Sequence, residues 1–227
     1  MIRLEHISKT YRDAGRGTAV EALQDISLHV ERGGFLAVTG GSGSGKTTLM
    51  NIVGCLDRPT AGRCRIDGLD PACMTDRQRS RLRGEKIGFI FQGFNLLRDR
   101  TALENVMLPL SLRGLDRKEQ KRQAALALEQ VGLGDRLDHR PGQLSGGQQQ
   151  RVAIARVIAC HTPLILADEP TGNLDPQAAQ NIMGILQTLN GQGVTILLIT
   201  HDPQIAAQAA ARAVMREGRL YTEQSSL

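Results

Sequence analysis

A glycine-rich segment ending in a lysine and a threonine is the first feature of this chain that could do chemistry. Residues 40–47, GGSGSGKT, fit the pattern GxxxxGK(S/T) and lie between an apolar run at 35–39 and an apolar helical pattern at 46–53. In such a loop, backbone N–H groups turn inward around phosphate oxygens, and the positive end of the following helix strengthens the attraction. The segment predicts a nucleoside triphosphate site.

Two side chains of this segment have expected roles. Lys46 would contact the β- and γ-phosphates, and the hydroxyl of Thr47 would coordinate Mg²⁺. The alternative is a glycine-rich turn that binds nothing, which the flanking strand and helix disfavour. The predicted nucleotide-binding residues here are Gly40, Gly41, Ser42, Gly43, Ser44, Gly45, Lys46, Thr47 and Thr48.

Two adjacent carboxylates follow a second apolar run, at 164–167. We expect Asp168 to hold Mg²⁺ through water and Glu169 to polarise the water that attacks the γ-phosphate, because phosphate hydrolysis depends on positioning and charge stabilisation. Taken alone, Glu169 could be a solvated carboxylate at the end of a strand. Together with the phosphate loop, the pair predicts hydrolysis of the bound triphosphate.

A second glycine-rich helix start lies at residues 144–148, LSGGQ. Ser145 is placed to cap the helix, and the missing Cβ atoms of Gly146 and Gly147 would let an anion approach its N-terminus. A capped turn without a ligand is the simpler interpretation. One nucleotide does not need two phosphate-binding helix starts on the same chain.

The elements that must position these groups alternate between strand and helix. Four short apolar runs, at 35–39, 87–91, 164–167 and 194–200, predict strands buried on both faces of a parallel sheet. Each run is followed directly by a glycine or a polar residue: Gly40, Gln92, Asp168 and His201. Ligands bind at the carboxyl ends of parallel strands, so these residues could converge on one site. Helical patterns are expected at 46–53, 118–131, 148–160, 176–189 and 203–214.

The rest of the chain predicts two additions to this α/β core. Residues 92–147 are mostly helical in pattern, which indicates a helical lobe. Alternating apolar residues near the N-terminus predict half-exposed antiparallel strands: Leu4 and Ile7, then Ile26, Leu28 and Val30. We expect one domain over 1–227, with a nucleotide-binding core at 1–95 and 156–227 and a helical subdomain at 96–155.

Composition limits the function classes. Of the 227 residues, 41% are apolar, and the longest apolar runs have strand length, so no membrane span is expected. The start of the chain lacks the apolar segment of a secretory signal, which predicts a cytoplasmic location. The net charge of +5 is spread thinly, and only 3% of residues are aromatic, which disfavours nucleic-acid binding. The four cysteines form no CxxC pair and are expected to be reduced structural thiols.

With the motifs in this order, the whole chain resembles the ATPase subunits of the ATP-binding cassette (ABC) family. The resemblance implies a P-loop NTPase (RecA-like) core with a mainly parallel sheet, and ATP and Mg²⁺ as cofactors. It also implies a head-to-tail dimer of identical or paralogous subunits that encloses two ATP molecules. In that dimer the second helix start would act on the partner's nucleotide, through Ser145, Gly146, Gly147 and Gln148.

The resemblance also implies roles for four single residues. Tyr11 would stack on adenine, although a surface aromatic on a strand is the alternative. Gln92 would bind Mg²⁺, sense the attacking water and connect the site to the helical lobe, although it could be a polar strand terminus. His201 would contact the γ-phosphate and help to position Glu169. The predicted catalytic residues are thus Glu169, His201, Gln92 and Lys46.

The fourth residue, Asp175, would lie across the dimer interface. Asp175 before Pro176 is also a good helix cap, and both roles are compatible. For Asp202, which precedes Pro203 in the same way, we expect only the capping role.

Segments 87–97, 101–106 and 167–175 resemble the macrolide-exporter and lipoprotein-release type (MacB/LolD-like). The resemblance implies integral membrane permease subunits, a periplasmic adaptor, a position on the inner face of the cell membrane, and lipoprotein, peptide or antibiotic substrates. Phe94, Leu96 and Leu97 would contact the permease or, as readily, pack inside the helical lobe.

Two other functions remain open. Residues 98–101, RDRT, depart from the usual proline-containing connection and resemble the cell-division ATPase FtsE, whose role is regulatory. A non-transport cassette acting on nucleic acid or ribosomes is the other alternative, but the chain has neither the long insertion nor the second cassette of such proteins.

Overall fold

A six-stranded sheet forms the centre of the computed structural model, which describes residues 1–12 and 19–223. Its strand order is β5-β6-β7-β3-β8-β9, and every pair is parallel except the last. The strands are β3 (Phe35–Gly40), β5 (Ile87–Phe91), β6 (Leu164–Asp168), β7 (Thr195–Ile199), β8 (Ala211–Arg216) and β9 (Arg219–Glu223). The four predicted buried strands therefore lie side by side.

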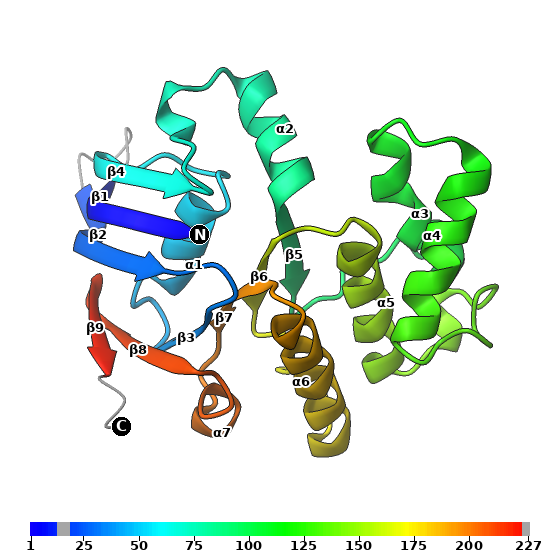
Figure 1. Cartoon of the computed structure of the whole chain (residues 1–227). Helices are drawn as coiled ribbons and strands as arrows, with labels where there is room; N and C mark the ends of the chain where they lie inside the picture. Colours follow the sequence, from blue (N-terminus) through cyan, green and yellow to red (C-terminus); the bar gives the residue numbers. More distant parts are fainter. Residues whose placement is uncertain (13–18, 224–227) are drawn as a thin grey trace.

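A three-stranded antiparallel sheet packs beside the central one (Figure 1). It has the order β2-β1-β4, with β1 (Ile2–Arg12), β2 (Ala19–Val30) and β4 (Ala61–Ile66). The apolar residues that predicted β1 and β2 are buried, because side chains alternate between the faces of a strand and only one face meets the core. The antiparallel prediction is confirmed, and β4 is an addition to it.

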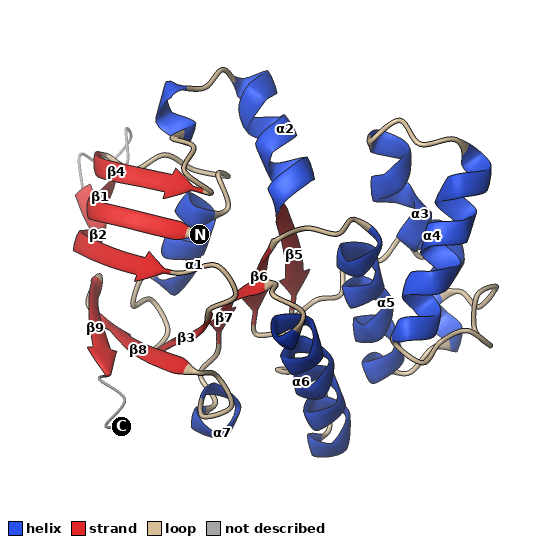
Figure 2. Ribbon diagram, viewed as in Figure 1, coloured by secondary structure: helices blue, strands red, loops and turns tan. Residues whose placement is uncertain are grey.

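The helices separate into groups, as Figure 2 shows. The three helices α3, α4 and α5 pack against one another on the side away from the antiparallel sheet, and α1 lies next to that sheet. The bounds are α1 (Lys46–Val53), α2 (Asp76–Lys86), α3 (Ala102–Leu112), α4 (Arg117–Gln130), α5 (Gly146–Ala159), α6 (Pro176–Gly191) and α7 (Pro203–Ala206), with short 3₁₀ turns η1 (Pro71–Cys73) and η2 (Pro141–Gln143).

Two apolar cores lie on opposite faces of the parallel sheet. Ala37 belongs to the core shared with α3 to α6, whereas its neighbours Leu36 and Val38 belong to the core shared with α1 and the antiparallel sheet. This alternation explains why the strands read as continuous apolar runs. The sheet is thereby fixed from both sides, and its carboxyl edge carries the candidate site.

One predicted helix is wrong. The pattern at 203–214 predicted a single helix, but α7 ends at Ala206 and the chain then enters β8. Alanines favour a helix locally, yet residues 211–215 pair in register with residues 36–40 of β3, and Ala213 and Met215 become fully buried there. Long-range pairing therefore outweighs local propensity.

The cysteine prediction holds in part. All four cysteines are free, and Cys55, Cys64 and Cys160 are buried. Burial raises the pKa of Cys55 to about 11 and that of Cys64 to about 12, so both stay protonated. Cys73, in contrast, is exposed on η1.

Candidate functional site

The carboxyl ends of four adjacent parallel strands bring the predicted catalytic residues to one edge of the sheet. Gly40 ends β3, Gln92 follows β5, Asp168 ends β6, and His201 follows β7 by two residues. Because β5, β6, β7 and β3 are neighbours in the sheet, these positions share one edge although they lie up to 161 positions apart in the sequence.

The phosphate loop has a backbone that only glycine tolerates at two points. Gly40 has a φ of 151°, and a Cβ there would lie 2.3 Å from the carbonyl oxygen of Met215. Gly45 has a φ of 106°, and a Cβ there would lie 2.5 Å from the carbonyl oxygen of Ala22. On the outer side of the loop, Cβ atoms at Gly41 and Gly43 would meet nothing within 4 Å. The loop therefore presents open backbone to an incoming anion.

Polar groups of this loop fit a triphosphate. No side chain caps the N-terminus of α1, so its first-turn N–H groups are available to phosphate oxygens. The hydroxyl of Ser44 is buried and has no hydrogen-bond partner in the described structure. Lys46 donates from Nζ to the carbonyl oxygens of Gly40 and Gly41, each at 2.7 Å, which holds the ammonium over the loop. Thr47 and Thr48 follow in the first turn of α1.

Two carboxylates at the end of β6 fit a divalent cation. The pKa of Asp168 is raised by its burial and by the neighbouring Glu169, and the Lys46 ammonium opposes that rise. Two like charges in a partly buried place destabilise each other, and a bound cation would remove this repulsion. Oxygen donors such as Asp168, Thr47 and Gln92 are the ligands that Mg²⁺ prefers.

Glu169 has a constrained position. Its φ of 46° is in the left-handed region, and its backbone N–H donates to the carbonyl oxygen of Ile199 at 2.9 Å. Its side chain is 17% exposed, and Nδ1 of His201, on a 70% exposed side chain, lies 2.9 Å from Oε1. A carboxylate oxygen accepts and an imidazole N–H donates, so this contact suits the tautomer with the proton on Nδ1. His201 therefore orients the side chain that is predicted to activate water.

Gln92 is linked to the loop after Glu169 by a partner that sequence reasoning missed. Nε2 of Gln92 donates to Oδ1 of Asn173 at 3.2 Å, and Nδ2 of Asn173 donates to the backbone oxygen of Gln92 at 3.2 Å. These two bonds connect the end of β5 to the loop that follows β6. Asn173 gave no sequence signal of its own, because an Asn in a loop has many ordinary roles.

Gln150 on α5 is a second residue that sequence reasoning missed. Its side chain is fully buried, and Nε2 donates to the carbonyl oxygens of Phe91, at 3.2 Å, and Pro170, at 2.6 Å. These carbonyls stand directly before Gln92 and directly after Glu169. The helix that begins at Ser145 is thus tied to both strand ends of the site. Polar helix positions are usually exposed, so periodicity could not identify Gln150.

The second glycine-rich helix start forms a separate pocket. Ser145 and Gln148 make a capping box, with the Ser145 hydroxyl accepting from the Gln148 N–H at 3.3 Å. A Cβ on Gly147 would lie 3.0 Å from Cβ of Ala178, so glycine lets α5 and α6 approach. Together with Asp175, these residues line a pocket of about 240 Å³ that contains no residue of the phosphate loop.

The two glycine-rich helices therefore do not share one site within this chain. The apolar residues of α1 belong to one core and those of α5 to the other, on opposite faces of the sheet. A Cβ on Gly146 would lie 3.5 Å from Cδ2 of Leu174. Asp175 caps α6 by accepting from the Ala178 N–H at 2.9 Å, and Asp202 caps α7 in the same way at Gln204, at 2.7 Å, as predicted.

Tyr11 lies near the end of β1, with 42% of its surface exposed. Its hydroxyl donates to Oδ2 of Asp57 at 2.8 Å. Partial burial and this hydrogen bond raise the pKa of Tyr11, whereas the nearby Thr48 hydroxyl lowers it. The ring therefore stands beside the helix that carries Lys46 and Thr47, with exposed surface.

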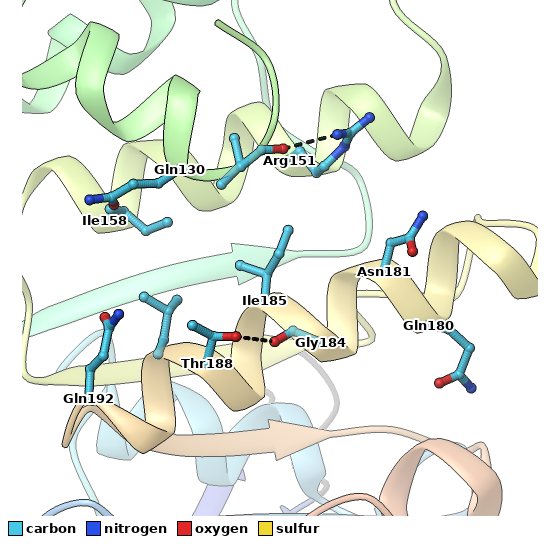
Figure 3. A pocket seen from close by; sticks show the side chains of 11 residues that line it. Gln130, Arg151, Ile158, Gln180, Asn181, Gly184, Ile185, Thr188 and Gln192 are labelled. Carbon is cyan, nitrogen blue, oxygen red and sulfur yellow. Dashed lines mark hydrogen bonds between the residues drawn. The ribbon is translucent and has the colours of Figure 1, made fainter.

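Two further hollows border α5. A cleft of about 620 Å³ lies between α5 and α6, lined by amides such as Gln130 and Asn181 and by Ile185, and it contains none of the predicted site residues (Figure 3). At its rim Arg151 donates to the carbonyl oxygen of Val131 at 3.0 Å, which joins α5 to the end of α4.

The second hollow is a mainly apolar groove of about 310 Å³ between β5, α3 and α5. Phe89, Phe91, Leu108 and Leu112 line it, and Leu112 is 84% exposed. Of the three residues expected at a partner contact, Leu97 is exposed outside this groove and Leu96 is partly buried against the core. The third, Phe94, has a φ of 52° and its carbonyl oxygen accepts from Arg156, which also lines the groove.

Comparisons with known proteins identify the relatives of this arrangement. The family model described as ABC transporter matches residues 23–172. A macrolide export ATP-binding/permease protein MacB from Syntrophobacter fumaroxidans is 52% identical over all of this chain, which spans 32% of that protein. The ABC transporter ATP-binding protein YvrO from Bacillus subtilis is 46% identical, over 99% of this chain and 97% of that protein. The chain thus spans about a third of the MacB relatives and nearly all of YvrO.

Solved structures agree with the fold. The dimeric structure of a post-hydrolysis state of the ATP-binding cassette MJ0796 bound to ADP and Pi has a TM-score of 0.89 and 40% identity, with 98% of each chain covered. A second dimeric structure of MJ0796, called a bacterial ABC transporter cassette, has a TM-score of 0.88 and 41% identity over 97% of this chain.

Proposed function

Because this chain belongs to the ABC transporter family, as an ATP-binding and ATP-hydrolysing cassette, we propose that it powers a separate membrane permease. ATP-driven dimerisation of two cassettes supplies the movement, and the permease exports or extracts a lipoprotein, a peptide or an antibiotic-like compound. The observation that carries this proposal is the exposed apolar groove beside the end of β5, because it lies next to the predicted nucleotide site.

In this proposal the chain's own residues divide the work of hydrolysis. The N–H groups of the phosphate loop and Lys46 bind the phosphates. Thr47, Asp168 and Gln92 hold Mg²⁺, which supplies neutralising charge when bound. Glu169 takes the proton of the attacking water, and His201 holds the Glu169 carboxylate through the 2.9 Å contact described above.

The second helix start completes the site of a partner cassette. Ser145, Gly146, Gly147 and Gln148 face the partner's nucleotide, with Asp175 beside them at the interface. Two observations support this assignment: Ser145, Gly147 and Gln148 line a pocket that contains no residue of their own phosphate loop, and the MJ0796 structures are dimeric. The partner cassette is an identical or paralogous chain.

The apolar groove is the proposed permease contact. Leu108 and Leu112 project from α3, and Arg156 lines the groove and donates to the carbonyl oxygen of Asn95. Arg113 donates to the carbonyl oxygens of Gly84 and Cys160, two residues that line the groove. The relative from S. fumaroxidans is named as a combined ATP-binding/permease protein, which supports a membrane partner for this cassette. No helix in the described ranges 1–12 and 19–223 has the length and apolarity to cross a bilayer. We place the chain at the cytoplasmic face through its permease.

The test is co-purification from membranes with the permease encoded beside it. Leu112→Glu, at an 84% exposed position, should abolish co-purification and leave ATP affinity unchanged. Leu126→Glu, on the exposed face of α4 outside the groove, is the matched control. Retention of the permease by Leu112→Glu would refute the groove as the contact.

A deletion experiment distinguishes transport from a regulatory role of the cell-division type. Deletion of the cassette and its permease should cause the transported compound to accumulate if the pair transports. A division defect without accumulation would favour the regulatory role, and purification with ribosomes or nucleic acid instead of a permease would favour a non-transport cassette.

A further inference from the structure

Behind the ring of Tyr11 lies a charged network that no sequence motif marks. Lys9 and Tyr11 stand two positions apart on β1 and share one carboxylate on the loop after α1. Nζ of Lys9 donates to Oδ1 of Asp57 at 2.7 Å, and the hydroxyl of Tyr11 donates to Oδ2 of the same group at 2.8 Å. Nζ of Lys9 also donates to the carbonyl oxygen of Arg58 at 2.7 Å.

The same lysine covers the aromatic ring. Its ammonium lies 4.8 Å from the centroid of the Tyr11 ring, within the range of a cation–π contact, and its side chain is only 13% exposed. One face of the ring is thus occupied by a held cation, while 42% of the Tyr11 surface stays exposed.

Asp57 is a stable anchor because its carboxylate stays ionised. Burial would raise the pKa of Asp57, but hydrogen bonds from Lys9, Tyr11 and the Arg58 N–H outweigh it and hold the pKa below its usual value. Charge-assisted hydrogen bonds of this kind are about twice as strong as neutral ones. The ring is therefore held through both its edge and one face.

The anchor is also attached to the phosphate loop. The backbone N–H of Asp57 donates to the carbonyl oxygen of Asn51, inside α1, at 3.1 Å. Lys46 and Thr47 stand at the other end of this eight-residue helix. The phosphate loop, α1, Asp57 and the Tyr11 ring form one connected unit, so a movement of the ring relative to the phosphates requires breaking the network.

We propose that Lys9 and Asp57 are positioning residues for the nucleobase, holding Tyr11 as a platform with one free face at a set distance from the phosphate loop. The proposal rests on the proposed ATP-binding function and on the base-stacking role that the family resemblance implies for Tyr11. A ring held in advance loses less freedom when a base stacks on it, so removing the network weakens nucleotide binding without touching the phosphate contacts.

Calorimetric titration with Mg²⁺-ATP and, separately, with Mg²⁺-tripolyphosphate tests this, because tripolyphosphate has no base. Lys9→Met, Asp57→Leu and Tyr11→Phe should each weaken ATP binding about three- to tenfold, or about 0.7–1.4 kcal/mol, because the ring must then be ordered on binding. Each should leave tripolyphosphate affinity at the wild-type value. Asp57→Asn, which keeps an acceptor for the Tyr11 hydroxyl, should recover part of the loss. In turnover assays these variants should raise KM more than they lower kcat.

The control is Asp25→Asn, which removes the carboxylate from an exposed contact with His6 on the same sheet and should change neither affinity. If Tyr11→Ala binds ATP like the wild type, the base-stacking role itself is wrong. If Tyr11→Ala weakens ATP binding but Lys9→Met and Asp57→Leu do not, the platform stands and the positioning proposal falls. Equal loss of tripolyphosphate affinity would also overturn it, because the network would then act through the phosphate loop.

Discussion

Replacing Gln150 with leucine tests the buried hydrogen bonds that connect α5 to the sheet edge carrying the candidate site. Leucine is close in size to glutamine, so the change removes polar atoms without opening a large cavity. The variant loses the two bonds that Nε2 donates to the carbonyl oxygens of Phe91 and Pro170. It also removes Oε1, which is buried without a partner.

The expected cost follows from these contacts. Each lost hydrogen bond is worth about 0.5–1.5 kcal/mol, which gives about 1–3 kcal/mol for the two. Removing the unpaired Oε1 offsets part of this loss, because a buried polar atom without a partner is itself destabilising. We therefore expect Gln150→Leu to lower the free energy of unfolding by about 1–2 kcal/mol, measured by urea denaturation.

The functional effect should exceed the effect on binding. Phe91 directly precedes Gln92, and Pro170 directly follows Glu169. Loosening these two positions should therefore disturb the predicted catalytic residues more than the phosphate loop. We expect kcat for ATP hydrolysis to fall about tenfold, a loss of about 1.4 kcal/mol in transition-state stabilisation, while the Kd for ATP changes less than twofold.

The neighbouring Gln149→Leu is the control. Gln149 is only half-buried and makes one bond, to the carbonyl oxygen of Leu144 at 3.0 Å, so its loss should cost at most about 1 kcal/mol and leave kcat unchanged. Wild-type stability and kcat in Gln150→Leu would refute the tie. Equal effects in both variants would mean that any polar-to-apolar change on α5 acts in the same way.

The remaining predictions concern hydrolysis, phosphate binding and acid stability. Glu169→Gln should keep ATP binding and lower kcat at least a hundredfold, trapping an ATP-bound dimer in size-exclusion chromatography; unchanged turnover would remove Glu169 as the base. Lys46→Ala should weaken ATP binding itself at least tenfold in titration, and wild-type affinity would contradict the phosphate loop. Asp67, nearly buried, accepts from Lys86 at 3.0 Å and pairs with Arg32. The hydrogen bond from Lys86 is the main cause that lowers the pKa of Asp67 in the folded protein. The ionised Asp67 therefore stabilises the fold above the pKa that it has in the unfolded chain, and this stabilisation is lost as pH falls through the folded-state pKa. Asp67→Asn should thus cost about 1–2 kcal/mol at neutral pH in urea denaturation, and the difference from wild type should shrink below pH 4; a constant difference across pH would speak against the ion pairs.

Several parts of the fold and site were predictable because their signals are local. The phosphate loop depends on glycines whose positive φ values no other residue adopts easily, and they stand where the pattern placed them. The buried strands read as apolar runs because both of their faces are covered. Helix starts at Ser145, Asp175 and Asp202 follow from side chains that reach their own backbone within three residues.

Other parts depend on partners far away in the chain. The segment after Ala206 becomes β8 because β3 pairs with it, although its alanines favour a helix. Gln150, Asn173, Lys9 and Asp57 look like ordinary polar residues in the sequence. The side-chain bonds that connect them to other segments span 20 to 81 positions, and no local period or cap indicates such a contact.

Residue types and their spacing were thus enough to predict the groups that would contact phosphate, because those groups occupy consecutive positions in the sequence. The folded chain alone determined what holds those groups in place, since buried hydrogen bonds and ion pairs form between segments that meet only when the sheets and helices pack. Each such contact contributes a free energy of about 1 kcal/mol. It leaves no local pattern in the sequence, yet it fixes the geometry of the sheet edge that carries the candidate site.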